Sequence, residues 1–275
     1  MSAPLLGRDR RWRTAISSAD PDGARLRGYA LLELAASDRV PFSDLLYLTA
    51  TGELPDPGRS RMLRMMLTVT AAQGISVTGV STRTAAAAGV ATQVGICAGL
   101  TTIGEEVGGA GEELARDLQR ALPLAEARTL DRARRHEAAH DVAASLAAGY
   151  LARRGRVPGF GHVLHREGDP RAALLLAQAG ACGLDGVYVG VLRRLEASVA
   201  ERAGRPIPPN IDGADAALLC ELGMPWPYAR PVVMLGRLVG LAGIAAEAAL
   251  DGASLPAGLL EFDYDGPAPR PLPAG

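Results

Sequence analysis

Apolar residues recur at helical spacing over most of this 275-residue chain. An apolar position every three or four residues gives a helix one face that it can bury against a core. No stretch alternates apolar and polar residues as a half-buried strand requires, so the sequence predicts an all-α fold. The predicted helices cover residues 61–72, 82–100, 112–121, 132–153, 171–181, 187–203 and 231–250, and a shorter apolar helical run covers 216–222.

Glycine and proline mark the predicted ends of these helices, because both residues disfavour a continuing helix. The stops lie at residues 52–57, 104–111, 157–161, 204–209 and 223–227. The last ten residues, 266–275, are rich in proline and alanine and are predicted to form an extended tail.

Arginine is the only strongly basic residue: the chain has 29 basic side chains and contains no lysine. This excludes mechanisms that depend on a lysine amine, such as Schiff-base aldolases, pyridoxal-phosphate enzymes and P-loop nucleotide hydrolysis. The planar guanidinium favours paired hydrogen bonds to carboxylates and phosphates instead. A net charge of -1 gives the molecule no overall attraction to nucleic acid or to an anionic membrane.

Three isolated cysteines, Cys97, Cys182 and Cys220, show no paired spacing, which favours a reducing compartment over a disulfide framework. The first residues lack an apolar core of signal-peptide length, and Gly, Arg or acidic residues interrupt every apolar run before ~18 residues. The sequence therefore predicts a soluble, cytoplasmic protein with no nucleic-acid or membrane partner.

Two segments carry candidate chemistry. Residues 157–162, Val-Pro-Gly-Phe-Gly-His, place the imidazole of His162 in a tight turn, and Arg166 and Arg171 follow close behind. About forty residues later, in Pro-Pro-Asn-Ile-Asp-Gly-Ala, Asp212 begins an apolar helical run. The arginines suit a carboxylate or phosphate substrate, and the acid suits a general base.

Further segments accompany these two in a fixed order. They are residues 12–16, 27–29, 47–48, 51–55, 108–110, 222–225, 236–240 and 264–267, together with Phe42. In this order and spacing, the chain resembles the citrate synthase superfamily, in particular its short members related to citryl-CoA lyase and the C-terminal part of ATP-citrate lyase.

The resemblance implies a citrate-synthase-like helical fold with a large domain and a smaller inserted domain. Mapped here, the large domain takes residues 1–107 and 214–265, the small domain takes 108–213, and the tail takes 266–275. It also implies a homodimer, in which the helical stretch 82–100 is buried against its symmetry mate. A monomer would leave too large an apolar face exposed.

The resemblance also implies roles for individual residues. Asp212 matches the acid that removes a proton from the methyl group of an acetyl thioester, and His162 matches the imidazole that donates to the keto oxygen of the partner substrate. The implied carboxylate-binding and substrate-side positions are Arg171, Arg237, Gln73, Val107, Gly108 and Gly109, and the implied coenzyme A positions are Arg166, Gly159 and Gly161. Coenzyme A enters as a thioester substrate, and no resident cofactor or metal is expected.

Two positions depart from the superfamily pattern. Members usually carry a histidine immediately before Gly108-Gly109, where it polarises the thioester carbonyl, but this chain has Val107. A second histidine that contacts the oxo acid is replaced by Gln73. Losing one oxyanion donor costs about 10²–10³ in rate. ATP-citrate lyase also lacks the histidine before its Gly-Gly pair.

Simpler roles for these residues stay open at this point. Asp212 could cap the helix that follows it, His162 could be a structural turn residue, and the arginines could form internal ion pairs. His136-Glu137-Ala138-Ala139-His140 matches the HExxH pattern of zinc proteases, but no third ligand follows, which favours a solvated helix face. The glycines of 104–111 follow no strand, which argues against a dinucleotide loop.

The sequence therefore supports one main hypothesis, an enzyme that makes or cleaves the carbon–carbon bond between an acyl-CoA enolate, such as that of acetyl-CoA, and a 2-oxo acid such as oxaloacetate. The alternative is a degraded paralogue that binds CoA thioesters as a regulatory or structural subunit, and Val107 and Gln73 favour it. A zinc peptidase is a third hypothesis that a metal assay would test.

Overall fold

The computed structural model describes residues 13–153, 157–162 and 164–251. The chain divides into two compact units, the first formed by residues 1–71 and 103–237 and the second by 72–102 and 238–275. Trp12, residues 264–267 and the predicted tail lie outside the described residues. The predicted large and small domains have other boundaries, at 107 and 213, and that division stays a prediction.

The first unit begins with a small antiparallel sheet that the sequence pattern did not predict. Strands β1 (Ser17–Asp20), β2 (Gly23–Leu26) and β3 (Tyr29–Ala30) pair in the order β1-β2-β3. The second turn has positive φ angles at Arg27 (49°) and Gly28 (90°), and Gly23 ends the first at 130°. Strands this short and largely exposed carry no alternating apolar signal, so periodicity alone could not reveal them.

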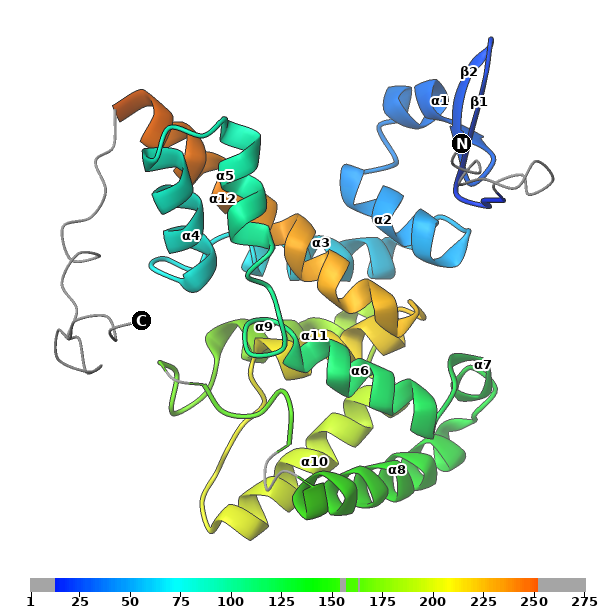
Figure 1. Ribbon diagram of the computed structural model, residues 1–275. Coiled ribbons are helices and arrows are strands. Elements are labelled where there is room, and N and C mark those ends of the chain that lie inside the picture. The colour runs from blue at the N-terminus through cyan, green and yellow to red at the C-terminus, as the bar shows by residue number, and fades with distance from the viewer. Residues whose placement is uncertain (1–12, 154–156, 163, 252–275) are drawn as a thin grey trace, which may run out of the picture. The chain divides into compact units, whose positions relative to one another are not determined.

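The rest of the first unit is helical (Figure 1). Its elements are α1 (Leu31–Ala36), α2 (Phe42–Thr51), α3 (Pro57–Val69), α6 (Ala110–Ala121), α7 (Leu124–Ala127), α8 (Arg132–Arg153), α9 (Pro170–Ala179), the 3-10 turn η1 (Gly180–Cys182), α10 (Val187–Ala203), α11 (Ile211–Glu221), the 3-10 turn η2 (Trp226–Tyr228) and the start of α12 (Ala229–Asp251). The all-α prediction is confirmed, and the predicted stretches 132–153 and 187–203 match α8 and α10 at both ends.

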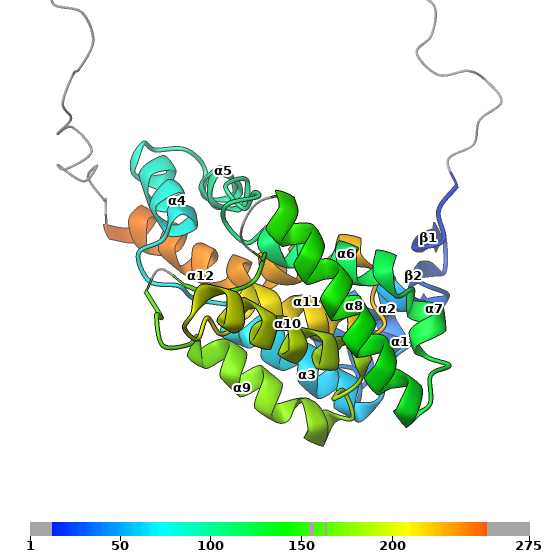
Figure 2. The same cartoon turned by 90° about the horizontal axis from the view of Figure 1, so that it is seen from below.

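Helix α11 is the central element of this unit. Nine of its eleven residues are buried, and it packs against α6, α9 and α10. Figures 1 and 2 both show α8 lying along α10, on which it packs extensively. Two buried hydroxyls also join distant parts of this core: Tyr188 donates to the Leu122 carbonyl at 2.7 Å and Tyr47 to the Leu222 carbonyl at 3.1 Å.

The second unit contains α4 (Val77–Ala87), α5 (Thr92–Leu100) and the last part of α12. The single predicted helix over 82–100 is wrong in one respect, because residues 88–91 separate two helices. Gly89 has a φ of 83°, which the interior of a right-handed helix cannot contain. Alanines on both sides of this break hid it from the periodicity, since alanine fits helices of either extent.

By length and composition alone, one helical stretch among the described residues, Trp226–Leu250, is apolar enough to cross a membrane, with a mean hydropathy of 1.7. One such stretch is weak evidence, because core helices of soluble proteins have the same composition. Arg230, Arg237 and Glu247 interrupt this stretch, yet its mean hydropathy stays high.

Candidate active site

The two chemistry-bearing segments lie side by side in the first unit. The amide of Gly161 donates to the Pro208 carbonyl at 3.0 Å, and the amide of Asn210 donates to the Gly159 carbonyl at 2.9 Å. Phe160 and Pro209 form the antiparallel bridge between these two bonds. The turn that carries His162 is therefore fixed directly against the start of the helix that carries Asp212.

Glycine is required where these segments meet. Gly159 has a φ of 80°, and a Cβ there would lie 2.6 Å from the Cα of Gly213. Such a contact is far closer than van der Waals packing permits, so any side chain would push the turn away from α11. Gly161 has a φ of 73°, and its carbonyl accepts a hydrogen bond from the Asn210 amide group at 2.7 Å. Both predicted coenzyme A positions thus have structural roles here.

Asn210, not Asp212, caps α11. Its side-chain oxygen accepts hydrogen bonds from the backbone amides of Asp212 at 3.0 Å and Gly213 at 3.2 Å. The alternative that Asp212 serves only as the helix cap is therefore wrong. The carboxyl of Asp212 lies in the first turn of the helix and does not act as its cap.

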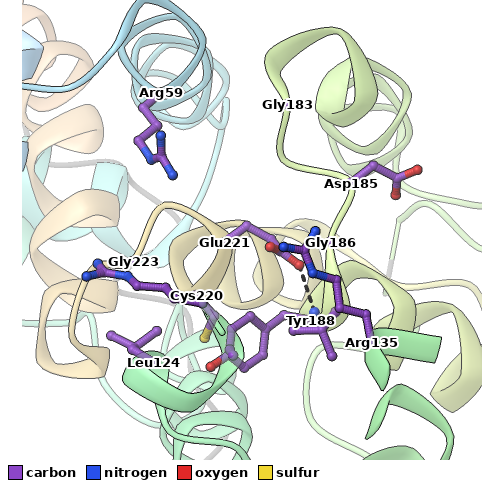
Figure 3. Close-up of a pocket in the computed structure, with 13 residues that line it drawn as sticks. Arg59, Leu124, Arg135, Gly183, Asp185, Gly186, Tyr188, Cys220, Glu221 and Gly223 are labelled. Atoms are coloured by element: carbon purple, nitrogen blue, oxygen red, sulfur yellow. Dashed lines mark hydrogen bonds between the residues drawn. The ribbon is translucent and has the colours of Figure 1, made fainter. Parts of the chain in front are cut away.

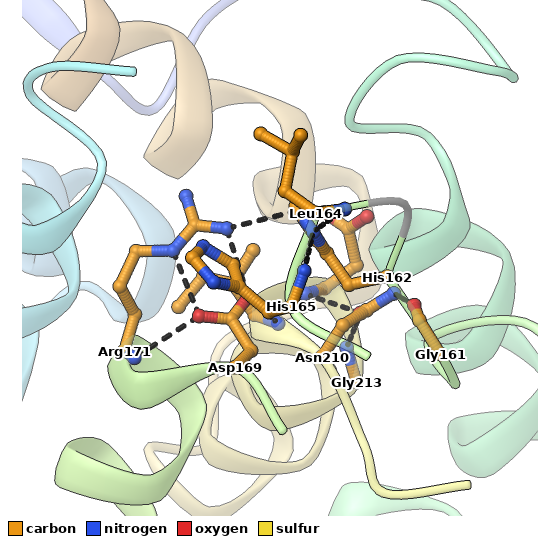
Figure 4. A network of polar contacts seen from close by, with 10 residues as sticks. Gly161, His162, Leu164, His165, Asp169, Arg171, Asn210 and Gly213 are labelled. Atoms are coloured by element: carbon orange, nitrogen blue, oxygen red, sulfur yellow. Dashed lines mark hydrogen bonds and ion pairs between the residues drawn. The ribbon is translucent and has the colours of Figure 1, made fainter. Parts of the chain in front are cut away.

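Asp169 connects α9 to α11 (Figure 4). Its buried carboxylate accepts from Nε of Arg171 at 3.0 Å, from Nη2 of Arg171 at 2.8 Å and from the amide of Ile211 at 3.0 Å. These bonds hold the pKa of Asp169 below its usual value against the opposing effect of burial, which is the largest single influence. The paired bonds between Asp169 and Arg171 fix the direction of the guanidinium next to His162.

His162 is held in one tautomer. Its Nδ1 accepts from the backbone amides of Leu164 and His165, both at 3.1 Å, so Nδ1 carries no proton. Partial burial, helped by the charges of His165 and Arg171 and opposed by Asp169, lowers the pKa of His162. A neutral ring with an unprotonated Nδ1 must carry its proton on Nε2. That nitrogen lies 3.5 Å from Nη2 of Arg171, on the same side as the guanidinium (Figure 4).

Burial raises the pKa of Asp212, with Arg171 opposing this effect and Asp169 adding to it. Helix α6 comes very close to this residue, because a Cβ on Gly111 would lie 3.6 Å from the Cβ of Asp212. A carboxyl in such surroundings is a stronger base than one in water. Arg171 thus acts on both His162 and Asp212, which lie in separate segments of the sequence.

Arg237 is 5% exposed, and its Nε has no hydrogen-bond partner among the residues that the structure describes. Burial lowers its pKa, and the charge of Arg171 lowers it further, which places the two guanidiniums near each other. Two like charges at a buried site are unfavourable unless an anion lies between them.

The glycine-rich loop before α6 ends beside this cluster. The amide of Gly104 donates to the Val107 carbonyl at 3.1 Å, and Gly108 has a φ of 75°. Gly109 precedes α6, two residues before the Gly111 that packs on Asp212. A cavity of about 410 Å³ opens at this loop, and it is lined by Glu105, Glu106, Gly109, Ala110, Glu112, Glu113, Arg116, Pro158 and Arg230.

Two predicted site residues are not placed in the cluster. Gln73 belongs to the second unit, outside the unit that holds His162 and Asp212. Arg166 is exposed on the segment between His162 and α9, with its side chain in solvent. Of the HExxH residues, His136 and His140 are both exposed on α8. Within the described residues, no group of three or more His, Cys, Asp or Glu side chains is arranged to hold a metal ion.

Three residues of the cluster were not singled out from the sequence: Asp169, Asn210 and Asp215. Asp169 and Asn210 each stand one position before a helix, where a capping residue is expected, and this signal could have revealed them. Asp215 lies one turn after Asp212 on α11, in a run of alanine and leucine where an acid is out of place. An acid in such an apolar run is the sequence feature that could have revealed Asp215.

A second cavity in the same unit, of about 220 Å³, lies near the other end of α11 (Figure 3). Glu221 accepts there from the backbone amides of Tyr188 at 2.7 Å and Val189 at 3.1 Å, at the start of α10. Burial raises the pKa of Glu221 to about 7, although the two amides and Arg135 favour its charged form. Arginines 59, 128 and 135 also line this cavity.

Comparison with known proteins finds one matching family and several similar structures. The family model described as citrate synthase, C-terminal domain, matches residues 43–253. The structure of citryl-CoA lyase from Hydrogenobacter thermophilus superposes with a TM-score of 0.81 at 27% identity, covering 96% of this chain and 98% of that one. A search of curated proteins found no match.

More distant solved structures share the fold. ATP citrate lyase from Methanothrix soehngenii, solved with citrate and coenzyme A, has a TM-score of 0.72 at 20% identity, and the match covers 95% of this chain and 43% of that one. Citrate synthase from Thermotoga maritima has a TM-score of 0.64 at 20% identity, covering 84% and 59%. The family model spans most of the described residues and the site residues lie within it, so the chain belongs to the citrate synthase family of enzymes.

Proposed function

We propose that this protein makes or cleaves the carbon–carbon bond between the α-carbon of an acyl-CoA and the keto carbon of a 2-oxo acid. The observation that carries this proposal is the cluster in which a buried carboxyl of raised pKa, Asp212, lies with a neutral imidazole, His162, and two guanidiniums, Arg171 and Arg237. A base, a donor and two anion-binding groups are what this reaction needs.

In the direction of condensation, the carboxylate of Asp212 removes a proton from the carbon next to the thioester. The electrons of that C–H bond move onto the thioester oxygen and form an enolate. The enolate carbon then attacks the keto carbon, and the keto oxygen takes a proton from Nε2 of His162 as it becomes a hydroxyl. Cleavage is the same sequence in reverse and starts from the form in which the proton lies on Asp212 and not on Nε2 of His162. His162 then accepts the hydroxyl proton as the carbon–carbon bond breaks, and Asp212 gives its proton to the enolate carbon.

Arg171 and Arg237 are proposed to hold the carboxylates of the oxo acid or of citrate. The bonds of Arg171 to Asp169 and its approach to His162 use Nε and Nη2, which leaves Nη1 for a ligand. The internal ion pair considered from the sequence is observed for Arg171, which pairs with Asp169. Arg237 has no such pair within the described part of the chain, and a bound carboxylate would supply its missing partner.

Citryl-CoA is the substrate that we propose first. A citryl-CoA lyase matches this chain over almost the full length of both, whereas the citrate synthase from Thermotoga maritima is matched over 59% of its length. The coenzyme A part enters and leaves as a thioester, so the proposed reaction needs no resident cofactor.

The test is to incubate the purified protein with (3S)-citryl-CoA and measure the release of acetyl-CoA and oxaloacetate, with the reverse reaction assayed in parallel. Asp212→Asn is the matched control, because the amide keeps the shape of the side chain but cannot accept a proton. We expect turnover in the parent and none above background in the variant, with citryl-CoA still bound in calorimetry. Binding without turnover in the parent itself would establish the alternative, a paralogue that only binds CoA thioesters.

We also propose that the protein is a homodimer. In the second unit, α4, α5 and their flanking loops expose five apolar side chains: Ile75, Val77, Val80, Val90 and Val94. Ile75 is 96% exposed, which is costly for a side chain of this size in water. Burial of these groups against the same helices of a second copy would remove that cost.

A further inference from the structure

Asp215 has the most unusual surroundings of any acid in the described chain that the proposed mechanism leaves unused. It is 7% exposed, and neither of its carboxyl oxygens has a hydrogen-bond partner within the described residues. A buried carboxyl with no partner costs several kcal/mol of stability, and such groups are rare in folded proteins. The cost suggests that the partner of this group is a ligand.

The position of Asp215 places it inside the reaction site. It lies three residues after Asp212, so both side chains project from the same face of α11. The charged groups that act on Asp215 are Asp212 on its own helix and Arg171 and Asp169 from the start of α9. Asp212 is the proposed base, Arg171 is a proposed anion-binding group, and Asp169 holds Arg171 in place.

The mechanism proposed above has not yet assigned a residue to the enolate oxygen. An enolate carries its charge on the former thioester oxygen, and catalysis needs a donor aimed at that oxygen. Val107, at the end of the loop that leads to α6, has no side-chain donor. Helix α6 packs on Asp212 through Gly111, so this loop and the start of α11 belong to the same small region.

We infer that Asp215 is a catalytic residue, a neutral carboxylic acid whose O–H donates to the enolate oxygen. This inference rests on the proposed function, since it assigns the donor for that same reaction. While Asp212 takes the proton from carbon, Asp215 keeps its own proton and shares it in a hydrogen bond with the developing oxyanion. No proton leaves Asp215, so the carboxyl is ready for the next turnover.

The protonation state needed for this role agrees with the surroundings. Burial raises the pKa of Asp215 well above its usual value, Asp212 and Asp169 add to this effect, and Arg171 opposes it. The two acids on α11 are then divided in function: Asp212, which is less deeply buried than Asp215, loses its proton first, and Asp215 retains it. Neighbouring acids whose surroundings separate their pKa values commonly take the separate roles of base and acid.

The test compares Asp215→Leu with Asp215→Asn. Leucine removes the donor, whereas asparagine keeps a neutral donor of the same shape. The readout is exchange of the methyl hydrogens of acetyl-CoA with deuterated solvent in the presence of a non-reactive oxo-acid analogue. We expect exchange to fall by about 10²–10³ in Asp215→Leu and to be largely recovered in Asp215→Asn. Cys220→Ala, a buried change further along α11, serves as the control for altered packing.

Thermal stability distinguishes a catalytic role of Asp215 from a structural one. Because leucine removes a buried polar group that has no partner, Asp215→Leu should melt at the same temperature as the parent or higher. Unchanged exchange in a folded Asp215→Leu protein would overturn the inference and leave the proposed function intact, provided that Asp212→Asn abolishes exchange. If the parent itself neither exchanges the methyl hydrogens nor cleaves citryl-CoA, the proposed function fails and Asp215 has no enolate to stabilise.

A second readout does not depend on turnover. The carboxymethyl thioether of coenzyme A presents a carboxylate near the position where the enolate oxygen would form. Asp215→Leu should weaken binding of this analogue more than binding of acetyl-CoA, and Asp215→Asn should restore the difference. Equal weakening of both ligands would show general damage to the pocket and would contradict the donor role.

Discussion

At the scale of single residues, the site depends on how each ionisable group is neutralised or paired. Asp169 is charged and fully bonded, and His162 is neutral with its proton on Nε2. Arg237 is buried, and the part of the chain that the structure describes offers no partner for its Nε. A ligand can compensate the charges that the protein itself leaves unpaired at a buried site.

Arg237→Leu tests this view of the anion site. Leucine fills a similar buried volume but cannot bind a carboxylate, so binding of citrate or citryl-CoA should weaken by roughly 2–5 kcal/mol. The melting temperature should stay the same or rise, since a buried charge has been removed. Calorimetry measures the affinity, and Arg83→Leu, which breaks an exposed pair with Glu247 in the second unit, is the control. Unchanged affinity would remove Arg237 from the ligand site.

At the scale of elements, the site is assembled by helix ends. The His162 turn is joined to the start of α11 by backbone hydrogen bonds, and the start of α9 is joined to α11 through Asp169. At its other end, α11 is joined to the start of α10 through Glu221. A change at either end of α11 therefore reaches the elements that carry the site.

Gly159→Ala should displace the His162 turn from α11. The new Cβ would lie 2.6 Å from the Cα of Gly213, and the φ of 80° adds strain of about 1–3 kcal/mol. Gly183→Ala is the matched control, because it has a φ of 70° but open space around the added carbon. In denaturant unfolding, we expect Gly159→Ala to lose clearly more stability than Gly183→Ala, and to lose activity as well. Equal losses would show that the two segments separate without cost.

Glu221→Gln should change how stability depends on pH. The pKa of Glu221 is about 7 in the folded protein and near 4.5 in the unfolded chain. The folded state therefore retains the proton over this range, and the contribution of Glu221 to stability is full below pH 4.5 and is lost as pH rises to 7. Glutamine stays neutral, and its carbonyl oxygen can still accept from Tyr188 and Val189.

Melting curves at several pH values measure this effect. The variant should gain stability relative to the parent as pH rises from 4.5 to about 7, because Glu221 becomes charged first in the unfolded parent. A constant difference between the two proteins across this range would contradict a buried acid of raised pKa. Glu137→Gln, an exposed change on α8, controls for loss of charge alone.

At the scale of the whole molecule, the second unit has little core of its own. Residues 72–102 supply two short helices rich in glycine and alanine, and several of their large apolar side chains are exposed. Association with a second copy is the way in which such a surface is commonly buried.

One chain has a mass of 28.5 kDa. Light scattering at micromolar concentration should therefore give twice this mass. Val80→Glu and Val94→Glu, which place charges on α4 and α5, should shift the protein toward the monomer. Leu174→Glu, an exposed apolar position of the first unit, is the control and should leave the mass unchanged. A parent protein that is monomeric would rule out the proposed interface.

Much of the fold could be predicted from the sequence, because helical periodicity is a local property. The limits of α10 follow from the spacing of its apolar residues and from Gly186 and Gly204 at its ends, and those of α8 follow from apolar spacing. The break at Gly89 and the sheet of residues 17–30 were missed, since alanine runs and strands of two to four residues carry no periodic signal.

The sequence by itself determined the residue types of the site, the order of its two segments and the helical framework that holds them. Only the tertiary structure decided the ionisation of His162, Asp212 and Asp215. A pKa depends on burial and on charges within a few ångströms, and those charges come from residues about forty positions apart that meet only after folding. For the same reason Asp215 stood out in the sequence only as an acid in an apolar run, and the fold placed it beside the base.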